Sequence, residues 1–414
     1  MNTAEAQTLL VTLLDPSNRA DPYPVYARIR EAGPLVLRDG HLVVFSSFAD
    51  CDEILRHPDS ASDGTKSTMV QRRMADGEAV RPLGTPGFLF LDPPDHTRLR
   101  RLVSKAFVPK VVKALEPDIT AMVGDMLDAV EQRGSFDVIA DLAYPLPVAV
   151  ICRLLGVPLE DEPQFSHASA VLAQALDPFI TVTGGMPDNV DERLAAGTWL
   201  REYLRGLIEQ RRAAPRDDLI SGLIAAEEAG DQLTEEEIVA TCNLLLIAGH
   251  ETTVNLIANA ALAMLRQPGE WAALAADPGR VATVVEETMR IDPPVQLAMR
   301  IAERDMTIGG TGEGDRGMIT VPKGDTMMLL FGAAHRDPDA FDRADSFEPD
   351  REVIRHLGFG KGPHFCLGAP LARLEASVAL TAVTARFPNA RIAAEPVYKP
   401  NLTLRGMASL PVTV

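Results

Sequence analysis

The chain has 414 residues, of which 46% are hydrophobic, and it carries a formal net charge of −18 at pH 7. The length and the hydrophobic content allow one large buried core, so we expect residues 1–414 to form a single domain. The strong negative charge excludes nucleic acid as a general partner. No run of eighteen apolar residues occurs, and the acidic N-terminus lacks the basic start of a signal peptide, so the sequence predicts neither a membrane span nor secretion.

Four cysteines, Cys51, Cys152, Cys242 and Cys366, are spaced without any CxxC pair. They are too few to cross-link a chain of this length, and the spacing is not that of a metal site. The pattern favours a reducing, cytoplasmic location, with at least three of the four as ordinary buried thiols.

The predicted elements change in character along the chain. PLVLRDGHLVVF (34–45) predicts two strands around an Asp-Gly turn, and residues from about 115 to 290 show helical spacing of apolar residues with Pro or Gly at the junctions. Further strands are predicted at 305–310, 319–324 and 326–331 and in the tail from 402 onward, with a flexible loop at 309–317. The fold class expected is mainly α with small β-sheets (α+β).

A basic run extends from His96 to Lys113 and contains no acid. Its six cations are Arg98, Arg100, Arg101, Lys105, Lys110 and Lys113. Such a run can be the solvated face of a helix, or it can bind an anionic group or an acidic partner. Because the run contains only cations in an otherwise acidic protein, the binding of an anionic group or an acidic partner stays open as an interpretation.

One long helix is predicted from Thr234 onward, where Thr234 and Glu237 form a capping box. Its middle reads Ala248-Gly249-His250-Glu251-Thr252-Thr253. A glycine inside a helix costs about 1 kcal/mol relative to alanine, and we interpret Gly249 as the point where the helix passes close to a flat group. Thr252 shares a face with Ala248 and can bind an oxygen or a water, while Glu251 can link that water to solvent. The alternative is a helix with an exposed acid and a buried threonine.

The segment from Phe359 to Gly368 predicts a tight loop that enters a helix. Three glycines lie in FGKGPHFCLG, and Pro370 stands early in the following amphipathic pattern. Cys366 therefore precedes a helix N-terminus, where the positive end of the dipole favours a thiolate. Without further context, a buried structural cysteine in a glycine-rich turn is the alternative.

The residues at fixed offsets in this loop resemble the FxxGxxxCxG signature of the cytochrome P450 family, in Phe359, Gly362, Cys366 and Gly368. The long helix matches the AGxET pattern of that family, and Glu287 with Arg290 matches its ExxR element, in the expected order. The resemblance spans nearly the whole chain from residue 21 and implies the cytochrome P450 fold. It also implies that Glu287, Arg290 and Arg351 form a structural charge network.

The resemblance implies a haem b cofactor with Cys366 as the iron ligand. It assigns the haem propionates to four residues, His96, Arg100, Arg300 and His356. The other residues expected around the haem are Ala248, Gly249, Phe359, Gly360, His364 and Gly368. Thr252 and Glu251 are the expected catalytic residues, because protons must reach dioxygen while its bond is cleaved.

The implied reaction is the insertion of one oxygen atom of O2 into a lipophilic small molecule by a monomeric monooxygenase. Electrons would come from NAD(P)H through a separate ferredoxin and ferredoxin reductase, and azole compounds would inhibit. The candidate substrate-pocket residues are Phe88, Leu89, Leu245, Ala248, Val295, Gln296, Leu297 and Leu402, with Gln296 as a polar contact. Two alternatives remain: a haem-thiolate peroxygenase, coupling enzyme or isomerase, and a haem-binding sensor without turnover.

Overall fold

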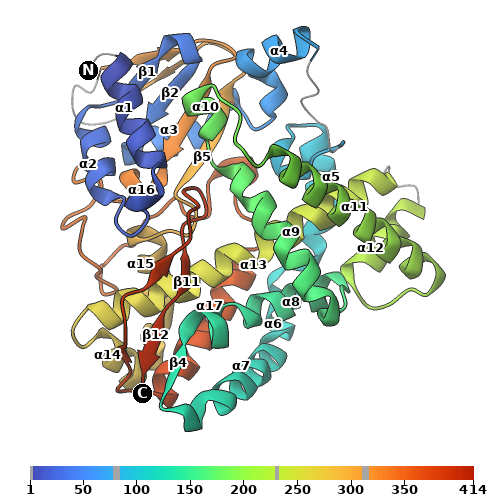
Figure 1. Ribbon diagram of the computed structural model, residues 1–414, viewed down its shortest axis with the longest axis vertical. Coiled ribbons are helices and arrows are strands. Elements are labelled where there is room, and N and C mark those ends of the chain that lie inside the picture. Colours follow the sequence, from blue (N-terminus) through green and yellow to red (C-terminus); the bar gives the residue numbers. More distant parts are fainter. Residues whose placement is uncertain (1–2, 78–83, 229–232, 310–316) are drawn as a thin grey trace.

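The computed structural model describes residues 3–77, 84–228, 233–309 and 317–414. Helices form most of this part of the chain, and small sheets built from both ends of the sequence lie beside them, as Figure 1 shows. The prediction of a mainly α protein with small sheets is confirmed. Residues 310–316 of the predicted flexible loop lie outside the described residues.

The helices fall into an N-terminal group, a central group and a C-terminal group. In chain order, the helices are α1 (Thr3–Leu14), α2 (Tyr23–Glu31), α3 (Phe48–Arg56), α4 (Thr68–Ala75), α5 (Asp95–Ser104), α6 (Pro109–Ala114), α7 (Glu116–Val130), α8 (Pro145–Leu155), α9 (Glu162–Ala173), α10 (Phe179–Thr183), α11 (Val190–Ala213), α12 (Leu219–Glu228), α13 (Glu235–Arg266), α14 (Glu270–Ala276), α15 (Val281–Ile291), α16 (Phe331–Ala334) and α17 (Ala369–Arg386).

The largest sheet has five strands in the order β1-β2-β8-β5-β3. Their bounds are Leu35–Leu37, Leu42–Phe45, Thr326–Leu330, Leu297–Ala302 and Ser60–Ala61. The predicted hairpin at 34–45 is confirmed as the antiparallel pair β1 and β2. Its turn is wider than a two-residue turn, because a 3₁₀ turn at Arg38–Gly40 precedes His41, which has a φ of 48°. The parallel pairing of β2 with β8 joins the N-terminal strands to the C-terminal third.

The remaining strands form three smaller sheets. These are β6 (Met306–Ile308) with β7 (Ile319–Val321), β10 (Val397–Tyr398) with β11 (Met407–Ser409), and β4 (Ser135–Asp137), β12 (Pro411–Thr413) and β9 (Arg391–Ile392) in the order β4-β12-β9. The strands predicted around 305–310, 319–324 and 326–331 and in the tail are confirmed by β6, β7, β8, β11 and β12.

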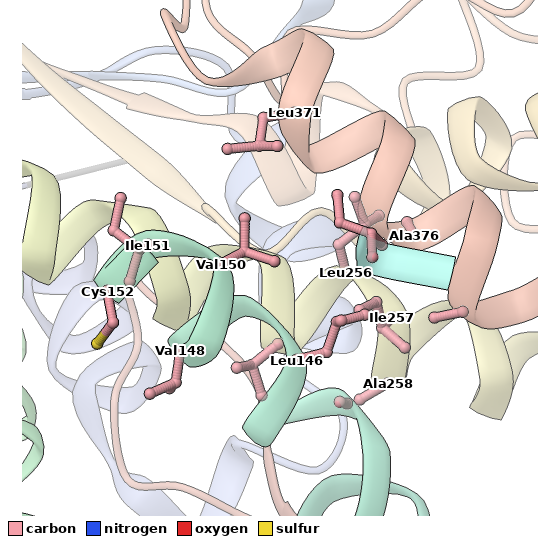
Figure 2. Packing of buried hydrophobic residues seen from close by; sticks show 14 of the residues in the cluster. Leu146, Val148, Val150, Ile151, Cys152, Leu256, Ile257, Ala258, Leu371 and Ala376 are labelled. Atoms are coloured by element: carbon pink, nitrogen blue, oxygen red, sulfur yellow. The ribbon is translucent and has the colours of Figure 1, made fainter. Parts of the chain in front are cut away.

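Helix α13 is the long central element, and both side chain and backbone bonds of the predicted capping box are present at Thr234 and Glu237. Helices α8 and α17 pack against it through aliphatic side chains (Figure 2). A side chain at Gly249 would meet Ile151 of α8, since an ideal Cβ lies 2.9 Å from Ile151 Cδ1. Close packing against α8 is therefore one reason for a glycine at this position, beside the predicted approach of a flat group.

In the described part of the chain, no helix is both long and apolar enough to cross a membrane. Cys51, Cys152 and Cys242 are free and buried, as predicted for ordinary thiols, whereas Cys366 is only partly buried.

Candidate active site

Cys366 lies in a tight loop that leads into α17. Its N–H donates to the Phe359 carbonyl oxygen at 2.8 Å, and the Gly360 N–H donates to the Leu357 oxygen at 2.7 Å. Gly362, with a φ of 65°, brings the loop so close to α3 that a Cβ would lie 2.6 Å from the Leu55 oxygen. Glycine is needed here for both its backbone conformation and its lack of a side chain.

The surroundings of the Cys366 sulfur have opposing effects on the pKa of its thiol. Burial raises the pKa of the Cys366 thiol, and the N–H groups of Gly368 and Ala369 together with the Arg100 guanidinium act in the opposite direction. The helix N-terminus favours the thiolate, as predicted, but desolvation is the larger effect in the protein alone, so the pKa of the thiol is raised. A bound metal cation would supply the missing stabilisation, since a coordinating thiol loses its proton.

Two arginines and two histidines lie together near this loop, and we call them the cation cluster after the two arginines: His96, which is buried, and Arg100, Arg300 and His364, which are half-buried. The rings of His96 and His364 lie 4.1 Å apart between centroids. Both ring nitrogens of His96 and Nδ1 of His364 are buried without a hydrogen-bond partner among the described residues. Burial and the neighbouring Arg300 and His96 lower the pKa of His364 to about 3, and burial lowers that of Arg300 to about 10.

The positive charges of Arg100 and Arg300 are not neutralised by another member of the cluster. Asp92 is the carboxylate that acts on His96 and Arg300. Its oxygens already accept from the N–H groups of Ser62 and Asp63 and from Lys66. Unpartnered donors beside arginines form a site for an anion that has at least two acceptor oxygens.

His356 lies outside the cation cluster, contrary to its prediction as a fourth propionate ligand. Its Nε2 pairs with Glu286 at 2.9 Å, and its Nδ1 accepts from the Gly358 N–H at 3.2 Å. Arg373 of α17 binds the same Glu286 and lies over the Phe359 ring, 4.4 Å from its centroid. Both ring nitrogens of His356 are thus occupied, and the nearby histidine that joins the cluster is His364.

Ala248, Gly249 and Thr252 are the residues of the predicted hexapeptide that remain accessible in the buried middle of α13. Ala248 is exposed and Thr252 is partly exposed, one turn apart. The Thr252 hydroxyl donates to the Ala248 carbonyl oxygen at 2.9 Å. That hydroxyl oxygen keeps lone pairs free to accept from a ligand on the same face.

Glu251 faces a different direction and is held by a lysine that the sequence analysis did not select. Its Oε1 lies 2.7 Å from Nζ of Lys399, the residue that follows β10, and the two residues are 148 positions apart. No local motif marks Lys399, because the contact depends on how the C-terminal strands fold back onto α13.

Glu287 and Arg290 form a fully buried ion pair within α15, which also contacts the segment before the Cys366 loop. Arg290 Nη2 lies 2.7 Å from Glu287 Oε1, and Arg351 Nε lies 3.1 Å from the same oxygen. Arg290 also donates to the carbonyl oxygens of His335, Ala344 and Ser346. All three residues named from the sequence are therefore in one network, which ties α15 to the chain that leads to Cys366.

Three of the candidate pocket residues point elsewhere. Gln296 is fully buried, and its Nε2 donates to the Pro293 carbonyl oxygen at 2.7 Å. Its Oε1 fills the space beside Gly332 that a Cβ at that position would occupy. Leu297 and Leu402 pack with α1 and α2 in the N-terminal hydrophobic cluster. These three are not pocket residues, because their surfaces are already used in the protein interior.

The other candidates stay compatible with a pocket in front of Ala248. Leu245 is one turn before Ala248 on α13, Phe88 is buried in the turn that contacts α13, and Leu89 and Val295 are at least partly accessible.

The family model described as Cytochrome P450 matches residues 42–277 and 281–401. The chain belongs to the cytochrome P450 family. It is a P450 monooxygenase of the bacterial type, an oxidoreductase, and the family implies a haem cofactor.

Relatives of this P450 cover its whole length. It is 39% identical over 402 residues to the "Vitamin D(3) 25-hydroxylase" of Pseudonocardia autotrophica, covering 95% of this chain and 94% of that protein. The ligand-free crystal structure of Mycobacterium smegmatis CYP164A2 is 65% identical, with a TM-score of 0.93 over 99% of this chain and 100% of that one. The same protein with econazole bound superposes with a TM-score of 0.92. Myxobacterial CYP267B1 in complex with myristic acid is 38% identical, with a TM-score of 0.85, covering 97% of this chain and 98% of that one.

The donor set of this P450 fits a haem. Cys366 offers a sulfur ligand, and the cation cluster offers unpartnered donors suited to two carboxylates. These residues come from α5, β5 and the Cys366 loop, and Arg100 is linked to that loop by a hydrogen bond to the Phe365 carbonyl oxygen. The residues that could hold the group are thus Cys366, His96, Arg100, Arg300 and His364.

Proposed function

We propose that the protein inserts one oxygen atom of O2 into a lipophilic small molecule, with electrons delivered by a separate ferredoxin and a reductase that uses NAD(P)H. One observation carries this proposal: the cation cluster, whose arginines are not neutralised, and the Cys366 loop occur in the same chain as an accessible threonine, Thr252, on α13. When bound, the haem supplies the activation of dioxygen. The protein residues bind and orient the reactants and move protons.

We assign each role to an atom. The Cys366 sulfur is the proposed iron ligand, and the side chains of His96, Arg100, Arg300 and His364 are the proposed donors to the propionates. The Thr252 hydroxyl accepts a hydrogen bond on the face of α13 that Ala248 leaves open, and Glu251 is the acid that returns protons to it. Leu245, Phe88, Leu89 and Val295 make the adjoining wall apolar, which suits a lipophilic substrate.

Names of relatives support this substrate class. Vitamin D(3) and myristic acid, which appear in the names of two relatives, are both lipophilic. The econazole complex of the relative that is 65% identical supports the further proposal that azoles bind and inhibit this protein.

Substitution of Thr252 tests the monooxygenase assignment. In Thr252→Ala, we expect product formed per NAD(P)H consumed to fall at least about tenfold, because a hydrogen bond on the proton path is lost. The measurement is product yield with ¹⁸O2, where one labelled oxygen should enter the product of the unsubstituted enzyme. Thr241→Ala, on the same helix but buried, is the control and should keep the yield. Label that enters only from peroxide would instead identify a peroxygenase.

The electron donor is proposed to bind the exposed part of the basic run. Arg101, Lys105, Lys110 and Lys113 are exposed on α5, α6 and the turn between them, and Val108, Val111 and Phe365 are exposed beside them. Arg98 is excluded from this surface, since it pairs with Glu237 and Asp95. Cations around an apolar centre fit a small acidic ferredoxin.

Charge reversal at this surface gives a salt-dependent prediction. Arg101→Glu or Lys105→Glu should slow reduction by an acidic ferredoxin about tenfold at low ionic strength, with a smaller difference at high salt. Stopped-flow reduction across a salt series measures this. Arg38→Glu, in the β1–β2 turn, changes the net charge equally and should have little effect. Equal slowing by Arg38→Glu would place the electron donor elsewhere.

A further inference from the structure

Glu286 of α15 and Arg373 of α17 form an ion pair beside the Cys366 loop. Two parallel bonds join them, since Arg373 Nε lies 2.6 Å from Glu286 Oε1 and Nη2 lies 2.9 Å from Oε2. We propose that Glu286 and Arg373 are positioning residues that set how readily the bound haem accepts an electron, through opposite effects of their two charges. The inference rests on the proposed role of Cys366 as the iron ligand.

The ion pair is fixed to the Cys366 loop through Phe359. The guanidinium of Arg373 lies 4.4 Å from the centroid of the Phe359 ring, within the range of a cation–π contact. The carbonyl oxygen of the same Phe359 accepts the Cys366 N–H at 2.8 Å. Burial raises the pKa of the Cys366 thiol, and the positive charge of Arg373 is one of the effects that oppose burial. The guanidinium is therefore held close enough to act on the sulfur.

His356 completes this network without adding charge. Its Nε2 lies 2.9 Å from Glu286 Oε2, and its Nδ1 accepts from the Gly358 N–H at 3.2 Å. A ring nitrogen that accepts carries no proton, so the imidazole donates from Nε2 and is neutral in this arrangement. The network thus contains one negative and one positive charge, which offset each other beside the Cys366 loop.

Glu286 stays an anion in this network. Burial raises the pKa of its carboxyl, but hydrogen bonds from Arg373 and His356 outweigh burial and lower the pKa to about 2. The Glu286 side chain is 28% exposed and that of Arg373 is 37% exposed, so water screens both charges only in part. A carboxylate and a guanidinium joined by two bonds have a fixed relative geometry. Glu286 therefore holds the Arg373 charge against the Phe359 ring.

The expected effect follows from the charge that the haem iron gains. One electron from an external donor lowers the charge of the iron by one, while no bond to the protein is formed or broken and no proton moves. A nearby cation favours the reduced haem, and a nearby anion disfavours it. Loss of the Glu286 charge should therefore raise the reduction potential, and loss of the Arg373 charge should lower it. If the pair only held the fold together, both losses would break the same contact and act in the same direction.

Four variants of the full haem-loaded chain test this inference: Glu286→Gln, Arg373→Met, the double variant of these two, and Arg373→Lys. The matched controls are Arg386→Met and Asp128→Asn, which break the pair between Arg386 of α17 and Asp128 of α7. Arg386 lies thirteen residues beyond Arg373, about 20 Å along the helix, and salt screens an exposed charge at that distance. The reduction potential is measured by absorption during a chemical titration, without substrate, ferredoxin or turnover.

In Glu286→Gln, we expect the ratio of reduced to oxidised haem at a fixed potential to rise about threefold, which is a shift of about 30 mV for a one-electron couple. Arg373→Met should lower this ratio by about the same factor. The double variant removes both charges and should return to the unsubstituted value. Arg373→Lys keeps the positive charge and should stay at that value, as should both controls.

Several results would overturn the proposal. These are shifts of the same sign in Glu286→Gln and Arg373→Met, an unmoved potential in Glu286→Gln, a double variant that stays displaced, and equal shifts in the controls. Glu286→Gln preserves the size of the side chain, so it tests the inference even if Arg373→Met does not retain haem.

The spectrum of the reduced carbon-monoxide complex separates this inference from the proposed function. A red-shifted Soret band together with unmoved potentials would reject only the role of Glu286 and Arg373. Absence of the red-shifted band in the unsubstituted protein would instead reject Cys366 as the iron ligand, and the proposed function with it.

Discussion

Cys366→Ala should abolish the red-shifted Soret band of the reduced carbon-monoxide complex and reduce substrate oxidation to background. The reason is chemical, since alanine has no atom that can bind iron. The sulfur of Cys366 stands within the cysteine loop, beside the backbone N–H groups of Gly368 and Ala369. Absorption spectra of purified protein, together with haem content per chain, measure the effect.

A second cysteine provides the matched control for this experiment. Cys152 is also a free thiol, but it is buried in α8 within the main hydrophobic cluster. Cys152→Ala should keep the red-shifted band and the full haem content, at a small cost in stability for the lost sulfur. Retention of the red-shifted band in Cys366→Ala would refute the assignment of the iron ligand and, with it, the proposed function.

Sequence alone predicted the features that depend on short-range spacing. The Cys366 loop and the capping box of α13 follow from residue types at fixed offsets, and the network of Glu287, Arg290 and Arg351 was implied by the family resemblance. Part of the sheets was also predictable, because β-branched runs and turn residues mark β1, β2, β6, β7, β8, β11 and β12 locally, whereas β3, β4, β5, β9 and β10 were not predicted. None of these required knowledge of which surfaces meet in three dimensions.

The incorrect assignments concern the direction in which a side chain points. Two histidines, His356 and His364, stand near Cys366, and sequence spacing could not show that Glu286 of α15 occupies the first of them. Gly249 was linked to a flat ligand, and the sequence could not show that it also packs closely against Ile151 of another helix. Lys399 was missed because its partner is 148 residues away. Such contacts depend on tertiary packing.

Gln296 and Leu297 illustrate the same limit in an extended segment. Val295 and Leu297 were both named as pocket residues, two positions apart in one segment. Val295, however, precedes β5 and forms only an isolated bridge with Leu404, while Leu297 begins the strand and packs with α1 and α2. Val295 and Leu297 therefore lie in different surroundings on the two sides of the start of β5, and this difference can be seen only in the folded structure.

Arg290→Met should be the most destabilising of the proposed substitutions. It leaves the Glu287 carboxylate in the interior without its main partner, and it removes donors from the carbonyl oxygens of His335, Ala344 and Ser346. Breaking a buried ion pair in this way costs about 3–5 kcal/mol. Because the network anchors the chain that leads to Cys366, haem retention should fall together with the free energy of unfolding.

The predicted loss of stability in Arg290→Met comes from the burial of the ion pair and not from the mere presence of an ion pair. A variant that breaks an exposed ion pair tests this distinction. Arg386 on α17 pairs with Asp128 at 2.8 Å at the surface, so Arg386→Met should cost no more than about 1 kcal/mol. Denaturant titration, with haem content as a second signal, compares the two variants. Equal losses in both would mean that the buried network does not hold the cysteine loop in place. A loss confined to Arg290→Met supports the view that α15 positions the iron ligand from outside the site.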